Sequence, residues 1–116
     1  MALILSVSYD SGLLITRQLV LQAQGYEVVS ALGLSEAMRH CQSGTKFDLF
    51  MLGHSISKTD KETLIAAFRA HCSAPIVALK RQGEVPVESA DFEIEPEPEK
   101  LLALVGALVS GSATSA

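Results

Sequence analysis

The chain has 116 residues, a length that suits one domain, and 48% of them are hydrophobic while only 19% are charged. This composition excludes an intrinsically disordered chain, because so many apolar side chains can form a buried core. The net charge of −4 is unevenly divided, since residues 1–81 hold six acids and eight bases whereas residues 82–116 hold seven acids and one base. An acidic end without a basic patch argues against nucleic acid as the main partner.

Three further features bear on whether the chain is cytoplasmic, secreted or associated with a membrane. The longest apolar run, Leu101–Val109, is far shorter than the ~18 residues of a membrane span. The N-terminus lacks the basic region of a signal peptide, and two cysteines are too few for a disulfide framework. We therefore expect a cytoplasmic protein with no membrane association, formed by one domain over residues 1–109 and a flexible tail over residues 110–116.

Strands and helices are expected to alternate along the chain. Apolar and β-branched runs predict five strands, at Ala2–Ser8, Tyr26–Ala31, Phe47–Leu52, Pro75–Leu79 and Asp91–Glu95. Apolar residues at helical spacing predict the helices between them, from Ser11 to about Gly25, Ser35 to about Ser43, Thr59 to about Cys72, and Glu97 to Val109. Ser11 is a candidate cap, and Thr59 with Glu62 forms a capping-box pattern. Between the last two strands the helix signal nearly vanishes, because Gly83 and Pro86 interrupt a polar stretch.

This alternation predicts an α/β fold with a parallel sheet covered by helices on both faces. Five strands suit a flavodoxin-like, doubly wound sheet of order 2-1-3-4-5, with the fourth helix shortened or missing. Function in such sheets collects at the carboxyl ends of the central strands. The residues there are Ser8 and Tyr9, Gly53, Lys80 and Glu95.

The order of these pieces resembles the receiver domain of bacterial response regulators over about residues 2–109. The pieces that carry the resemblance are Ile4-Leu5-Ser6-Val7, Gly25-Tyr26-Glu27-Val28, Ser35-Glu36-Ala37-Met38, Phe47-Asp48-Leu49, Pro75-Ile76-Val77-Ala78-Leu79 and Ala90-Asp91-Phe92. The resemblance implies the same fold and a role in two-component signal transduction or a phosphorelay.

The resemblance also implies a set of functional residues that this chain lacks. Receivers phosphorylate an aspartate after strand 3 and hold Mg²⁺ with an acidic pair after strand 1. They add a Ser or Thr after strand 4 and a Lys after strand 5. Here Gly53 stands at the acceptor position, Ser8 and Tyr9 at the acidic pair, Lys80 at the Ser/Thr and Glu95 at the Lys. We therefore expect a degenerate pseudo-receiver that lacks the phosphoacceptor aspartate, with no catalytic residue, metal or cofactor.

Two alternatives keep a chemical role for this edge of the sheet. A phosphoacceptor receiver with non-standard residues would use Asp10 or His54, although Asp10 suits a helix cap and His54 an exposed loop. A flavodoxin-like nucleotide or anion binder would use Ser8–Gly12, a small, hydroxyl-rich loop at a helix N-terminus. The loop has one glycine and no phosphate-binding lysine, so its signal is weak.

Lys80 and Glu95 suggest an ion pair across the edge where the acids are missing. Arg81 is a second candidate base for the same carboxylate. The alternative interpretation is that both charges are solvated, in which case a pair contributes only about 0–1 kcal/mol. The resemblance also implies a cis peptide bond at Glu95-Pro96.

His40-Cys41 and His71-Cys72 form a duplicate at the ends of two helices. Two Cys and two His can hold zinc, but adjacent residues on a helix do not easily point the same way. Core cysteines with exposed histidines are the better interpretation.

The acidic segment forms a candidate partner face. Its residues are Asp91, Glu93, Glu95, Glu97 and Glu99. We expect a phosphorylation-independent protein-protein interaction module whose partner is another signalling protein or a second copy of the chain in a homodimer.

Overall fold

The structure is a computed structural model that describes residues 2–71, 73–80 and 90–114, with side chains described up to residue 108. Its sheet consists of β1 (Leu3–Ser8), β2 (Glu27–Leu32), β3 (Leu49–Leu52), β4 (Ile76–Leu79) and β5 (Phe92–Ile94). The strands are parallel and lie in the order β2-β1-β3-β4-β5. The predicted flavodoxin-like sheet order is therefore confirmed.

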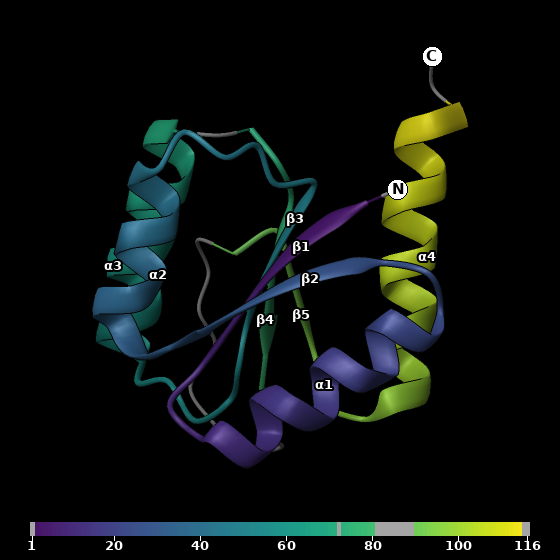
Figure 1. Cartoon of the computed structure of the whole chain (residues 1–116), viewed down its shortest axis with the longest axis horizontal. Coiled ribbons are helices and arrows are strands. Elements are labelled where there is room, and N and C mark those ends of the chain that lie inside the picture. The colour runs from purple at the N-terminus through teal and green to yellow at the C-terminus, as the bar shows by residue number, and fades with distance from the viewer. Residues whose placement is uncertain (1, 72, 81–89, 115–116) are drawn as a thin grey trace.

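Helices cover both faces of this sheet. The described helices are α1 (Ser11–Ala23), α2 (Gly33–Gln42), α3 (Lys58–His71) and α4 (Pro98–Thr114). Figure 1 shows α2 and α3 together on one side of the sheet and α1 and α4 on the other. None of the helices in the described ranges is long and apolar enough to cross a membrane.

The layer under α2 and α3 is an apolar core. Successive residues of a strand point to opposite faces, so Leu5 and Val7 of β1 enter this layer while Ile4 enters the other. Phe50 of β3 stacks on Phe68 of α3 with ring centroids 4.1 Å apart. The buried members of this core are Leu5, Val7, Ala31, Ala37, Cys41, Phe47, Phe50, Leu52, Ile56, Leu64, Ile65, Phe68 and Ile76.

The layer under α1 and α4 has a smaller apolar core and contains buried polar groups. Its buried apolar members are Ile4, Leu21, Leu49, Met51, Val77, Leu79, Leu101 and Val105. On α1 the buried residues are Leu14, Arg17 and Leu21, which share one helical face. A guanidinium therefore lies in the interior on this side of the sheet.

The helix starts differ locally from those expected. Of the two candidate caps for α1, the structure confirms Asp10, whose Oδ1 accepts from the Leu13 N–H at 3.1 Å, while Ser11 is the first residue of the helix. The prediction of a capping box at Thr59 and Glu62 is wrong. The helix α3 begins one residue earlier, and Ser57 Oγ accepts from the Asp60 N–H at 3.3 Å.

The predictions for the C-terminal third concerned the end of the last helix, a shortened fourth helix and a cis peptide bond. Helix α4 runs to Thr114, past the expected end at Val109, and the division into a domain and a tail stays a prediction. The shortened fourth helix falls on residues 81–89, which lie outside the described residues. No peptide bond in the described ranges is cis, so the expected cis bond at Glu95-Pro96 is wrong.

Candidate functional site at the carboxyl edge of the sheet

The loop after β1 is tied to the loop after β3 by hydroxyl groups. Ser8 Oγ lies 2.9 Å from Ser55 Oγ, and Ser55 Oγ accepts from the Tyr9 N–H at 3.1 Å. Ser8 Oγ also accepts from the Asp10 N–H at 3.0 Å. The Tyr9 and Asp10 N–H groups of this loop therefore donate to serine hydroxyls of the same chain. The Asp10 carboxylate accepts from the Leu13 N–H and so caps the next helix.

Gly53 lies where an added side chain would have little space. Its N–H donates to Val7 O at 2.8 Å, which holds the start of the loop against β1. A Cβ added at Gly53 would lie 2.7 Å from Arg17 Nη1, 3.0 Å from Val7 O and 3.2 Å from Ser8 Cβ. A side chain at this position would therefore start inside the space that the Arg17 guanidinium occupies.

Arg17 is the residue that the sequence analysis failed to single out. Its side chain is only 7% exposed, and its Nη2 lies 3.1 Å from His54 Nδ1. Burial lowers the pKa of this guanidinium, while the nearby Asp10 carboxylate raises it. Arginine nevertheless stays charged in proteins, so the edge contains a permanent buried cation. The signal was its position, three residues after Leu14 and four before Leu21, on the buried face of α1.

Lys61 is a second buried cation near the same edge, on the opposite face of the sheet. Only 3% of the residue is exposed, and its Nζ donates to Leu79 O at 2.9 Å, at the end of β4. Its helical spacing to Leu64 and Phe68 places it on the buried face of α3. As for Arg17, this position on a buried helix face was the available signal, although a charged residue is seldom fully buried.

Tyr9 is joined to the first turn of α3. Its hydroxyl donates to Asp60 Oδ2. This hydrogen bond, burial and the Asp60 charge raise the pKa of Tyr9 to about 12. The residue that stands at one position of the expected acidic pair is thus a neutral hydrogen-bond donor.

The expected ion pair between Lys80 and Glu95 is wrong. Glu95 Oε1 accepts from Lys100 Nζ at 3.0 Å, and Lys100 Nζ also lies 3.7 Å from Glu97 Oε2. Lys100 is in the first turn of α4, close in sequence to both acids, and the hydrogen bond that it donates to Glu95 raises its pKa. Within the described ranges Lys80 forms no ion pair with Glu95. Arg81, the alternative base, lies outside the described residues.

The candidate partner face is divided between two ends of β5. Asp91 precedes the strand, where its Oδ1 pairs with Arg69 at 3.0 Å and its Oδ2 accepts from the Ile76 N–H at 2.8 Å. Glu95 and Glu97 follow the strand and share Lys100. Asp91 therefore has a structural role at the amino end, while the exposed acids gather at the start of α4.

The two His-Cys pairs do not form a metal site in the described part of the chain. Cys41 is 4% exposed, and its thiol donates to Ala67 O at 3.4 Å between α2 and α3. Cys72 lies outside the described residues. No group of three or more His, Cys, Asp or Glu side chains that could hold a metal occurs in the described ranges.

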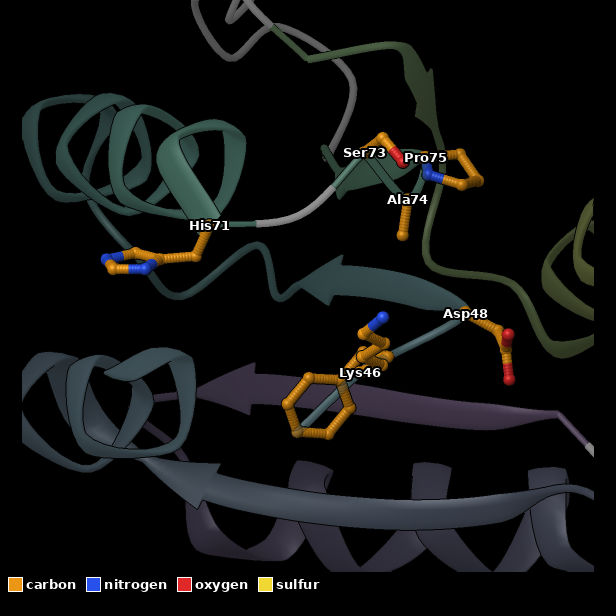
Figure 2. Close-up of a pocket in the computed structure, with 7 residues that line it drawn as sticks. Lys46, Asp48, His71, Ser73, Ala74 and Pro75 are labelled. Carbon is orange, nitrogen blue, oxygen red and sulfur yellow. The ribbon is translucent and has the colours of Figure 1, made fainter. Parts of the chain in front are cut away.

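A pocket of about 410 Å³ lies at the opposite, amino edge of the sheet. Figure 2 shows that the His71 ring and the Asp48 carboxylate point in different directions from this pocket. Asp48 Oδ2 is also engaged, since it accepts from the Leu3 N–H at 2.8 Å. The polar groups of this pocket do not converge, so we place the candidate site at the carboxyl edge.

Comparisons with known proteins give matches only to solved structures, since no family model and no curated protein matches the sequence. A two-component response regulator from Clostridium difficile is 26% identical, with a TM-score of 0.82 over 95% of this chain and 97% of that chain. The N-terminal domain of a response regulator/sensory box/GGDEF protein from Carboxydothermus hydrogenoformans is 22% identical, with a TM-score of 0.81 over 98% and 99%.

A response regulator from Thermotoga maritima, solved in complex with Mg²⁺ and BeF, is 20% identical, with a TM-score of 0.75 over 93% of this chain and 99% of that chain. The structural neighbours are therefore response regulator receiver domains. The chain has their fold, and they support the family resemblance that the sequence pieces indicated.

Proposed function

We propose that this chain is a pseudo-receiver, which acts in two-component signalling as a protein-interaction module independent of phosphorylation. The receiver fold of the structural neighbours supports the signalling role. One observation carries the independence from phosphorylation. The guanidinium of Arg17 lies 2.7 Å from the point where a side chain at position 53 would begin.

The chemistry of phosphoryl transfer supports this proposal. Transfer depends on a positioned acceptor and on a metal ion that neutralises the transferred group. Mg²⁺ needs oxygen ligands in near-octahedral geometry, and positions 8, 9 and 53 supply a serine, a tyrosine and no side chain. The residues present do not fit the ion, and a buried guanidinium beside them repels it.

The residues that could substitute for the acceptor are engaged elsewhere. Asp10 Oδ1 caps α1, and His54 Nδ1 lies against Arg17 Nη2. The hydroxyl-rich loop uses the Tyr9 and Asp10 N–H groups in internal hydrogen bonds, which weakens the nucleotide-binding alternative. An interaction role therefore remains the best supported.

We propose that the partner is a signalling protein with a basic surface, which docks on the acids at the start of α4. Glu95, Glu97 and Glu99 are exposed there, and Lys100 neutralises only part of their charge. A homodimer through this face would bring like charges together, so we propose a different protein as the partner. Salt should weaken this association, because exposed charges are screened.

The first experiment tests for a phosphate-driven switch. The protein is mixed with Mg²⁺ and beryllofluoride, or with a small phosphodonor, and amide shifts and intact mass are recorded. We expect no saturable shift and no added phosphate, whereas the Thermotoga regulator serves as the positive control. A Mg²⁺-dependent saturable shift near Gly53, or one added phosphate, would overturn the proposal.

The second experiment tests the docking face. Glu97→Lys with Glu99→Lys reverses two exposed charges, and Glu62→Lys is the control because Glu62 is exposed on α3. A partner cross-linked to the wild type should be lost from the double variant and kept by the control. Equal cross-linking to both variants would place the contact elsewhere.

A further inference from the structure

A small pocket lies between α1 and the start of α4, beside the carboxyl edge. Its volume is about 90 Å³. Its lining is mostly apolar, with a polar end formed by a guanidinium and an imidazole. The lining residues are Leu13, Thr16, Arg17, Val20, His54, Pro96, Pro98 and Leu101.

The cation at the polar end of this pocket forms no salt bridge with a carboxylate of the described residues, although Asp10 is near enough to raise its pKa. Among the described ion pairs none includes Arg17. Its Nη2 lies against the His54 imidazole, and its Nη1 is buried beside Gly53 with no hydrogen-bond partner. A buried charge is costly unless it is paired, and a buried donor without a partner requires an explanation.

A second buried polar atom in the same layer also has no partner. Ser6 Oγ is buried and makes no hydrogen bond. Alternation along β1 places Ser6 on the same face as Ile4, which packs in the layer under α1 and α4. These two atoms are the buried side-chain polar atoms without a partner in the described part of the chain, and both belong to this layer.

We propose that this pocket binds a small organic carboxylate, with its charged group at Arg17 and its hydrocarbon tail against Leu13, Val20 and Leu101. A guanidinium attracts a carboxylate by its charge, and a hydrogen bond between two charged groups is stronger than one between neutral groups. The apolar lining favours an anion with a tail over inorganic phosphate. This site does not depend on the proposed docking face, so either proposal can fail alone.

The volume limits the length of the tail. An engineered apolar cavity of about 150 Å³ takes benzene, so a pocket of this size suits an acid of about four carbons, such as butyrate. The acids next to Pro96 and Pro98 do not oppose binding strongly, because Lys100 pairs with both Glu95 and Glu97. The Thr16 hydroxyl donates to Gly12 O at 3.0 Å and leaves the charged end to Arg17 and His54.

The experiment uses butyrate as the probe and follows amide shifts of the full chain during titration. We expect saturable shifts confined to α1, the Gly53–His54 loop and the start of α4. Butyramide, which has the same tail without charge, should give none, and inorganic phosphate should bind much more weakly. Arg17→Met should weaken butyrate binding by about tenfold or more, as for the loss of a hydrogen bond to a charged group.

A matched control separates binding from folding. Arg39→Met removes an exposed arginine from α2, on the other side of the sheet, and should leave the butyrate titration unchanged. Val20→Phe should fill the pocket and abolish binding while Arg17 stays in place. Non-saturable shifts, equal binding by Arg17→Met, or equal binding of butyramide would overturn the proposal. Phosphate binding as tight as butyrate would overturn the apolar part of the site.

Discussion

Among the described residues, each of the two helical layers contains one buried cation near the carboxyl edge, and the two cations form different contacts. Under α3, Lys61 Nζ donates to Leu79 O at 2.9 Å, on the buried face of the helix that also carries Leu64 and Phe68. Under α1, Arg17 lies beside a pocket of about 90 Å³ and leaves Nη1 without a partner. Lys61 is satisfied by the fold itself, whereas a buried donor of Arg17 is not, and Arg17 is the one of the two that lines the pocket of the proposed ligand site.

The largest expected difference between the two layers is the free energy of unfolding lost when a core side chain is truncated. Phe68→Ala removes a ring that stacks on Phe50 and should lower the free energy of unfolding by about 3–5 kcal/mol. Leu101→Ala should cost only about 2 kcal/mol, the low end for such a change, because one side of Leu101 already borders the pocket. Urea unfolding measures both values. Equal costs would show that the two layers are packed alike.

The two cations should respond differently to the same substitution. Lys61→Met leaves the buried Leu79 carbonyl without its donor and should cost about 1–3 kcal/mol. Arg17→Met removes an unpaired buried charge and should change the free energy of unfolding by less than about 1 kcal/mol, because the lost hydrogen bond to His54 is offset. A loss of stability in Arg17→Met as large as in Lys61→Met would contradict the comparison.

Gly53 tests the tightness of the layer that contains Arg17. Gly53→Ala should cost about 1–3 kcal/mol, because its Cβ would overpack against Val7 O, Ser8 and the guanidinium. In an Arg17→Met background the cost should fall, since the shorter contact with Nη1 is gone. A double-mutant cycle from denaturant unfolding gives the interaction energy. If the costs of the two substitutions simply add, a Cβ at position 53 does not interact with the Arg17 guanidinium, and the described contact would be contradicted.

The smallest effect concerns pH and the bond between Tyr9 and Asp60. The folded pKa of Tyr9, about 12, lies above its unfolded value of 10.0, so this stabilisation is complete below pH 10 and is lost as pH rises toward 12. Wild-type stability should therefore fall more steeply over that range than that of Tyr9→Phe. Phenolate absorbance should also show a late-titrating tyrosine that the variant lacks.

Much of the fold could be predicted from the sequence, because strand and helix periods alternate strongly. The sheet order followed from five short strands separated by helices, and the strand ends lay within two residues of those expected. Helix starts were less predictable. Neighbouring residues such as Asp10 and Ser11, or Ser57 and Thr59, compete as caps, and only the backbone geometry decides between them.

The site was only partly predictable. The family resemblance led us to expect Gly53 at the acceptor position, but the sequence did not show that Arg17 reaches the space beside Gly53 from α1. It offered Lys80 as the partner of Glu95, whereas the nearer Lys100 forms the pair. Long side chains reach across elements, and one sequence does not show which of several bases lies closest. The buried faces of α1 and α3 did contain the signal for Arg17 and Lys61.

The burial of Cys41 has a consequence for measurement. Its thiol lies 4% exposed between α2 and α3, so an alkylating reagent reaches it only when that layer opens. In a Cys72→Ser background, the labelling rate of Cys41 would report the local opening free energy of one layer. If Cys41 becomes exposed only by global unfolding, butyrate bound under α1 should slow its labelling. If the layer under α2 and α3 opens locally, butyrate should leave the labelling rate unchanged. The chain thus contains a native reporter that distinguishes a local response to a ligand from a cooperative one.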